Sequence, residues 1–265
     1  MSELAVLFLH HADDAATRNN LAALRHHNPL VPVVPVSNFG VRLPGGYDAR
    51  QMTTGWRKML PSHRRGGLLR SWGRLRKNLE PRWVWRNSDL PAYMFMLWKN
   101  RPVQARRWFI FEWDMYCNVN LADWLGPAMD SPVVSTSLQY PGRNDFHYFN
   151  ESEMRKVPDS LRPHVMAANP WAGMLFSEDA LCAIARRVQE ADWHGGFCEM
   201  RVATVARSLG YQPIANPNPL AQRTLRAVTS FTLEQIDVQS VWHKVKTHDP
   251  LTLNAHEKTP ATQCS

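Results

Sequence analysis

Apolar and polar residues alternate along the chain in blocks that predict strands and helices in turn. Residues 4–9 form a short, continuous apolar run, which is typical of a strand buried on both faces. Residues 17–27 carry apolar side chains at a helical spacing, and Asn28 and Pro29 end that pattern. Residues 31–36 form a second apolar run. A strand, a helix and a strand in this order predict a parallel α/β sheet with a right-handed crossover.

Further helices and strands are predicted downstream. Residues 90–100 are so densely apolar that a largely buried helix is expected, with Ser88 or Asp89 as its N-cap and Pro91 in its first turn. Residues 177–189 and 193–209 predict two more helices, the second ending at Gly210. Before these two helices, residues 139–164 are polar, aromatic and irregular, which suggests a mobile substrate loop.

Two acids follow the apolar run 108–111 directly. If that strand persists through Asp114, side chains alternate, so Glu112 and Asp114 point to one side and Trp113 to the other. Two carboxylates at the end of a buried strand repel each other unless a cation lies between them, and a hard divalent ion such as Mg²⁺ or Mn²⁺ would serve. The alternative is an exposed strand end that carries two solvated acids.

Polar residues also follow the two N-terminal strands. His10, Asp13 and Asp14 come after the first strand, and Ser37 and Asn38 after the second. Ligands of parallel α/β sheets bind outside the carboxyl ends of the strands. We therefore expect these residues and the acid pair to lie along the same edge of the sheet.

Composition places the chain among folded globular proteins. It has 265 residues, of which 44% are hydrophobic and 20% charged, and it contains no apolar run near the ~20 residues of a membrane-spanning helix. The run 4–9 is too short for a secretory signal. The four cysteines show no zinc or disulfide spacing, which suits a reducing compartment, so a cytoplasmic protein is expected.

The net charge of +8 is concentrated in one segment. Residues 57–86 hold ten Lys or Arg and a single acid, Glu80. Apolar residues at positions 68, 72, 75 and 79 predict a short amphipathic basic helix within it. An anionic membrane surface, a phosphorylated substrate or a nucleic acid would each favour such a helix, and a solvated helix docked by its apolar stripe is the alternative.

The order of these features resembles the GT-A fold of nucleotide-sugar glycosyltransferases. The matching segments are the first strand and its loop, the acid pair, residues 169–173 (Asn-Pro-Trp-Ala-Gly), residues 195–201 (Gly-Gly-Phe-Cys-Glu-Met-Arg) and residues 243–246 (His-Lys-Val-Lys). The resemblance is strongest for GT-A-like proteins that carry Trp-Arg-Asn-x-Asp, here residues 85–89, before Glu-Trp-Asp. It implies a three-layer α/β/α sandwich around a mostly parallel mixed sheet.

The resemblance also implies roles for individual residues. Asp114 would ligate a divalent ion, Mn²⁺ or Mg²⁺, bound to the donor diphosphate, and His243 would match a late metal-ligand histidine. Glu112 replaces the first Asp of the usual Asp-x-Asp motif and would be a second ligand or a ribose contact. Glu199 is the candidate catalytic base, with a helix-start acid facing the macrodipole as the alternative. The remaining residues expected to contact the nucleotide sugar are His10, Asp13, Asp14, Asn87, Asp89, Arg201, Lys244 and Lys246.

The sequence as a whole predicts a single GT-A-like catalytic domain over residues 1–246, with a basic insert at about 48–86 and a disordered tail at 247–265. The expected function is metal-assisted hexosyl transfer from a nucleotide-diphosphate sugar to an unknown acceptor. The basic insert suggests a phosphorylated or lipid-linked acceptor, or peripheral contact with an anionic membrane, and nucleic acid is not the expected partner of the enzyme. A nucleotidyltransferase is disfavoured because the glycine-rich phosphate loop is absent after the first strand. The alternative is a catalytically inactive GT-A-like protein that binds anionic membrane or nucleic acid through residues 57–86.

Overall fold

The computed structural model describes residues 1–37, 42–52, 86–143, 147–193, 195–225 and 230–246. The expected basic helix at 68–79 and the expected disordered tail at 247–265 lie outside these residues. Residues 53–85, which make up most of the basic insert, and Asn38 also lie outside them.

The described residues form a seven-stranded sheet with the order β10-β6-β9-β4-β1-β2-β3. Neighbouring strands are parallel except at β9, which runs antiparallel to both β4 and β6. The predicted α/β class with a mostly parallel mixed sheet is therefore confirmed. The strands are β1 (Ser2–His10), β2 (Val33–Ser37), β3 (Tyr47–Asp48), β4 (Ala105–Glu112), β6 (Val133–Ser135), β9 (Leu175–Ser177) and β10 (Ile214–Ala215).

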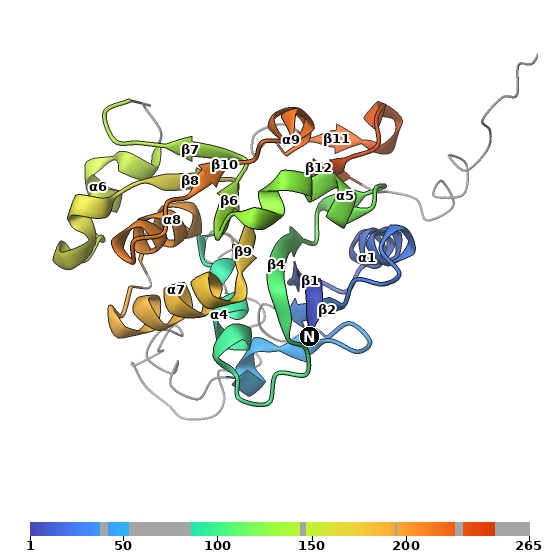
Figure 1. Cartoon of the computed structure of the whole chain (residues 1–265), viewed down its shortest axis with the longest axis horizontal. Coiled ribbons are helices and arrows are strands. Elements are labelled where there is room, and N and C mark those ends of the chain that lie inside the picture. Colours follow the sequence, from blue (N-terminus) through green and yellow to red (C-terminus); the bar gives the residue numbers. More distant parts are fainter. Residues whose placement is uncertain (38–41, 53–85, 144–146, 194, 226–229, 247–265) are drawn as a thin grey trace, which may run out of the picture.

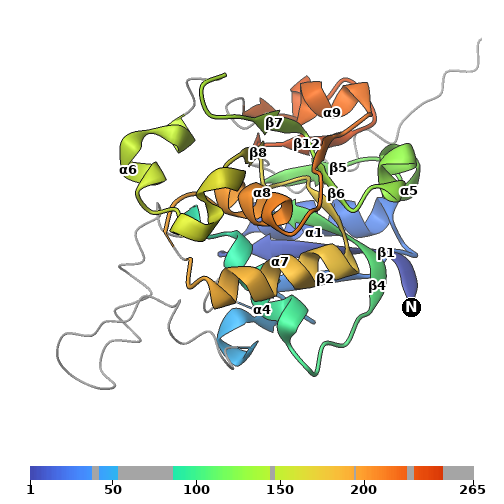
Figure 2. The same ribbon diagram turned by 60° about the vertical axis from the view of Figure 1, so that its left-hand side comes forward.

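Both faces of this sheet are covered by helices (Figure 1). On β1, Leu7 and its odd-numbered neighbours belong to a core shared with α4 (Asp89–Leu97), α7 (Glu178–Glu190) and α8 (Cys198–Ser208). Phe8 and its even-numbered neighbours belong to a second core with Leu21 and Leu24 of α1 (Ala15–His27). Side chains of β1 alternate between the two faces of the sheet. Both sets are apolar, which explains the continuous apolar run in the sequence. Figure 2 shows α4 and α7 together on one side of the sheet.

The longer helices are those that the sequence pattern predicts. α1 begins after Asp14, whose carboxylate accepts a hydrogen bond from the Thr17 backbone N–H at 2.8 Å, and α7 begins after Ser177, which caps it in the same way. The shorter helices are α5 (Leu121–Leu125), α6 (Glu151–Met154) and α9 (Pro219–Thr224). Among the described residues, no helix combines the length and apolar character needed to cross a membrane.

Three two-stranded sheets add to the main one, and one of them shapes its carboxyl edge. β5 (Met115–Cys117) pairs antiparallel with β12 (Val241–His243), which brings the end of the described chain back beside the end of β4. The other pairs are β7 (Ser137–Gln139) with β8 (Ala167–Asn169) and β11 (Phe231–Thr232) with β13 (Val245–Lys246).

The structure differs from the sequence prediction in two places near this edge. β4 ends at Glu112, and Trp113 and Asp114 form a turn into β5, so the strand does not persist through Asp114. The stretch expected to be irregular, 139–164, contains α6 and two 3₁₀ helices, His147–Phe149 and Asp159–His164. Tyr148 and Leu161 of this stretch are buried and hold its short helices against the core.

Candidate metal centre

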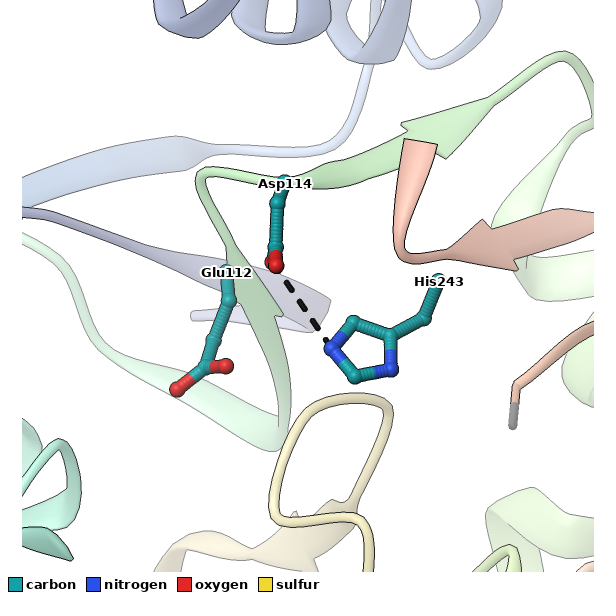
Figure 3. Close-up of side chains that lie close together, drawn as sticks. All are labelled: Glu112, Asp114 and His243. Carbon is teal, nitrogen blue, oxygen red and sulfur yellow. Dashed lines mark ion pairs between the residues drawn. The ribbon is translucent and has the colours of Figure 1, made fainter. Parts of the chain in front are cut away.

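Three side chains with metal-ligating atoms meet at the carboxyl edge of the sheet (Figure 3). They are Glu112 at the end of β4, Asp114 in the following turn and His243 at the end of β12. One ligand atom from each lies within 4.8 Å of the other two. His243 Nε2 is 3.7 Å from Asp114 Oδ1. The structure thus brings together the three residues that the sequence proposed as metal ligands.

Strand pairing accounts for this meeting of residues that are far apart in the sequence. In the β5–β12 pair, His243 lies opposite Met115, so its side chain is next to the Asp114 turn. The Asp114 carbonyl accepts a hydrogen bond from the Val245 backbone N–H at 2.7 Å. The turn is also tied to β1 and α1, because the Trp113 N–H donates to the Leu9 carbonyl and the Trp113 carbonyl accepts from the Asn20 amide. The carboxylate therefore projects from a turn held on both sides.

The electrostatics of the metal-free site disfavour a second negative charge. Burial, together with the adjacent Asp114 carboxylate, raises the pKa of Glu112 to about 8, and the charge of Glu199 acts in the same direction. A hydrogen bond from Ser88 and the charge of Lys244 oppose that rise in pKa. Burial and the neighbouring carboxylate therefore favour the protonated form of Glu112 in the metal-free protein.

The three side chains fit a divalent cation. Asp114 Oδ1 is buried and, among the described residues, accepts no hydrogen bond, and the 3.7 Å to His243 Nε2 is too long for one. Opposite ligands of an octahedral ion with bonds of about 2.1 Å lie about 4.2 Å apart. Atoms within 4.8 Å of one another therefore need only small movements to share an ion. One imidazole and two carboxylates suit a transition ion such as Mn²⁺ better than Mg²⁺.

The candidate base, Glu199, lies close to this cluster. It is in the first turn of α8 and is 5% exposed. Its Oε2 accepts a hydrogen bond from the Cys198 thiol at 3.0 Å, and its charge raises the pKa of both Glu112 and Tyr148. Burial raises the pKa of Glu199 itself, which moves it toward the range of a base that works near neutral pH.

Arg201, Asn87 and Asp89 form one buried ion-pair network. The Arg201 guanidinium donates to both Asp89 oxygens at 2.7 and 2.5 Å, and to Asn87 Oδ1 at 3.1 Å. Arg201 and Asp89 are both 0% exposed. These three residues were expected to contact the nucleotide sugar. In the structure their polar atoms join α8 to the start of α4, and their contact with the nucleotide sugar stays a prediction.

The residues after β1 also have partners within the chain. Asp13 forms an ion pair with Arg18, at 2.6 and 2.9 Å, which lowers the pKa of Asp13. Asp14 caps α1. His10 is 1% exposed, its Nδ1 lies 3.1 Å from the Ala12 carbonyl, and burial lowers its pKa. Its Nε2 is buried and has no hydrogen-bond partner within the part of the chain that the structure describes.

Two lysines were expected to meet phosphates. Lys244 is partly exposed and close enough to Glu112 to affect its pKa, whereas the side chain of Lys246 is outside the described residues. Sequence reasoning treated Ser88 only as a helix cap and did not select Cys198 or Tyr148, although all three lie around Glu112 and Glu199. Ser88 lies within the Trp-Arg-Asn-x-Asp motif, but at the position that the motif leaves open, so the motif itself did not select it.

Comparisons with protein-family models and with curated proteins find no match for this chain. Among solved structures, the chain is similar to the apo form of mouse xyloside xylosyltransferase 1, with a TM-score of 0.42 and 11% sequence identity. The match covers 80% of this chain and 84% of the other. At this score and identity the likeness carries no conclusion about activity, which has to be argued from the site itself.

Proposed function

We propose that this chain is a metal-dependent GT-A-like glycosyltransferase that moves a sugar from a nucleotide-diphosphate donor to an acceptor. The observation that carries the proposal is the cluster of Glu112, Asp114 and His243 at the carboxyl edge of a mostly parallel sheet. That edge is where such sheets bind ligands. The resemblance of the sequence to the GT-A family implies that Asp114 and His243 ligate a metal ion bound to the donor diphosphate, with Glu112 as a second ligand or a ribose contact.

The chemistry requires little proton transfer on the donor side. A divalent ion held by the three ligands would offset the negative charge that develops on the departing diphosphate. Lys244, which lies close to Glu112, would add positive charge at the same place. Asp114 and His243 are anchored by the β5–β12 pair, so they hold their positions before any ligand binds.

On the acceptor side, Glu199 is the group proposed to accept the proton of the attacking hydroxyl. Its charge interacts with Glu112, so it lies near the metal cluster without being one of the three ligands. Burial and the resulting raised pKa suit a general base. We expect Glu199→Gln to retain donor binding and to lose transfer, whereas equal loss of both would indicate a structural role.

Nucleotide binding tests the proposal directly. Isothermal calorimetry with UDP, GDP and CMP, each with and without Mn²⁺, should find at least one nucleotide that binds only when the metal is present. Asp114→Ala should abolish that metal-dependent binding, and Asp123→Ala, which removes an exposed acid from α5, should leave it unchanged. Binding of no nucleotide under any condition, or binding that survives Asp114→Ala, would contradict the proposal.

A further inference from the structure

A cavity of about 430 Å³ lies beside the segment that leads into α8. It is lined by Trp193 and Gly195 of that segment and by residues 155–159, between α6 and the end of the 3₁₀ helix Asp159–His164. Its volume falls in the range of about 300–1,000 Å³ in which proteins bind small molecules. The charged residues of its lining carry both signs and are Arg155, Lys156, Asp159, Arg162 and Asp192.

Two buried polar atoms next to this cavity have no hydrogen-bond partner among the described residues. They are Oε2 of Glu153, on α6, and Nε1 of Trp193, and the two residues are only 3% and 2% exposed. The other carboxylate oxygen, Glu153 Oε1, lies 2.6 Å from Lys156 Nζ and 3.1 Å from an Arg86 nitrogen, so two cations balance its charge. Because a buried polar atom without a partner is destabilising, the two atoms favour a group that pairs with both.

Gly196 leaves space for one small group between these two atoms. A Cβ at this position would lie 3.7 Å from Glu153 Oε2, 3.9 Å from Trp193 Nε1 and 3.2 Å from the terminal methyl of Met200. A hydroxyl group both accepts and donates. With small movements of the side chains, a hydroxyl oxygen near that point would accept from the indole N–H and donate to the carboxylate. A cation there would be repelled by the N–H dipole, and an anion by the carboxylate.

We propose that this space binds one hydroxyl group of a neutral sugar, and that the rest of the sugar occupies the adjoining cavity. Gly196 is three residues before Glu199 in the sequence, and Met200 belongs to the same first turn of α8 as that candidate base. The sugar is therefore assigned to the acceptor. This assignment rests on the proposed function, whereas the contact with Glu153 and Trp193 does not.

Nuclear magnetic resonance of the full chain with ¹⁵N-labelled tryptophan tests the contact. The indole signal of Trp193 is the one that Trp193→Phe lacks. Methyl glycosides of glucose, galactose, mannose and N-acetylglucosamine are titrated into the metal-free protein, and at least one of them should shift this signal. Absence of a shift with every glycoside would overturn the inference, because a buried water alone would then pair the two atoms.

Singly deoxygenated forms of the glycoside that binds identify the hydroxyl group. One of them should bind about tenfold or more weakly than the parent, because it leaves both buried atoms unpaired. This comparison needs only the wild-type protein, so it does not depend on the folding of any variant. Equal binding of all the deoxygenated forms would overturn the inference.

Gly196→Ala fills the proposed space with a methyl group and should raise the Kd for the glycoside by about tenfold or more. Gly210→Ala is the matched control. Its φ of +85° is close to the +82° of Gly196, so the backbone strain is similar, but its added Cβ has no atom within 4 Å. Gly210→Ala should leave the Kd unchanged, and equal effects of the two substitutions would contradict the proposed contact.

Glu153→Gln removes the charge of the accepting carboxylate and should weaken glycoside binding by about tenfold. Glu3→Gln is its control, because Glu3 forms an exposed ion pair with Arg106 at the opposite end of β1 from the site. It should leave glycoside binding unchanged. A Glu153→Gln protein that folds and binds the glycoside like the wild type would refute the role of Glu153.

Asp114→Ala separates this inference from the proposed function. It should abolish metal-dependent nucleotide binding and leave the glycoside-induced shift of the Trp193 signal unchanged. A wild-type protein that binds nucleotide but shows no glycoside shift contradicts this inference alone. A wild-type protein that shows the shift but binds no nucleotide contradicts the proposed function, and the sugar site then stands without its assignment to an acceptor.

Discussion

Replacement of Glu112 by glutamine should change how the stability of the metal-free protein depends on pH. Burial and the adjacent carboxylate raise the pKa of Glu112 from 4.5 to about 8 in the folded protein. The folded state therefore holds a proton that the unfolded chain releases near its ordinary pKa. This contribution to stability is fully present below pH 4.5 and is lost as the pH rises through 8.

The size of the effect follows from the same values. Each pKa unit corresponds to about 1.4 kcal/mol, and the linkage relation gives a loss of about 2.5 kcal/mol between about pH 6 and 8.5 for this carboxyl. Glu112→Gln has no proton to lose, so its stability should lack this decline. The free energy of unfolding of the wild type, minus that of the variant, should therefore fall by about 2.5 kcal/mol over that range.

Urea denaturation in EDTA at several pH values measures this difference, and other titrating groups are common to both proteins. Glu190→Gln is the control, because the Glu190 side chain is 65% exposed. The difference in free energy of unfolding between the wild type and this variant should not change over the same pH range. A wild-type minus Glu112→Gln difference that is constant from about pH 6 to 8.5 would refute the reasoning. It would mean that the two acids do not share a buried site.

Two further predictions concern the parts of the fold that support the site. Arg201→Leu should lower the free energy of unfolding by about 3–5 kcal/mol, because it leaves a buried carboxylate without its cation. Arg223→Leu removes an exposed ion pair and should lower it by less than about 1 kcal/mol. Urea denaturation of the two variants measures the difference. Gly173→Ala should lower the melting temperature more than Gly210→Ala. Both glycines have positive φ, at +83° and +85°, so the backbone strain of the two variants is similar. An added Cβ at Gly173 would lie 2.6 Å from a Leu225 methyl carbon, whereas one at Gly210 would have no atom within 4 Å. Equal decreases in melting temperature would show that the contact with Leu225 relaxes freely.

The strand–helix–strand start of the chain could be predicted because its signals are local. A continuous apolar run, a helical spacing and a breaking Asn-Pro pair define β1 and α1 without reference to the rest of the chain. The acid pair was also recognisable, but its geometry was not. The prediction placed Glu112 and Asp114 on one strand, whereas the structure places a turn between β4 and β5 there. That turn depends on the pairing of β5 with β12, a contact between distant segments that periodicity does not report.

The roles of Asn87, Asp89 and Arg201 show a second limit of sequence reasoning. A motif indicates that polar residues have a task at a site, but it does not distinguish contact with a ligand from contact with another residue. Asp89 and Arg201 are fully buried and neutralise each other. A charge is stable in the interior only with such a partner, and the partner of Asp89 is 112 residues away in the sequence. These three residues therefore position α8, and their contact with the donor stays a prediction.

The candidate centre consequently combines two kinds of support with different physical origins. Asp114 and His243 are held by backbone pairing between β5 and β12, which does not depend on the charge of either side chain. Glu199 lies in the first turn of α8, which is joined to the residues before and at the start of α4 by the network of Arg201. Substitutions of Asn87 or Asp89 should therefore disturb the candidate base while leaving the Asp114–His243 pair in place.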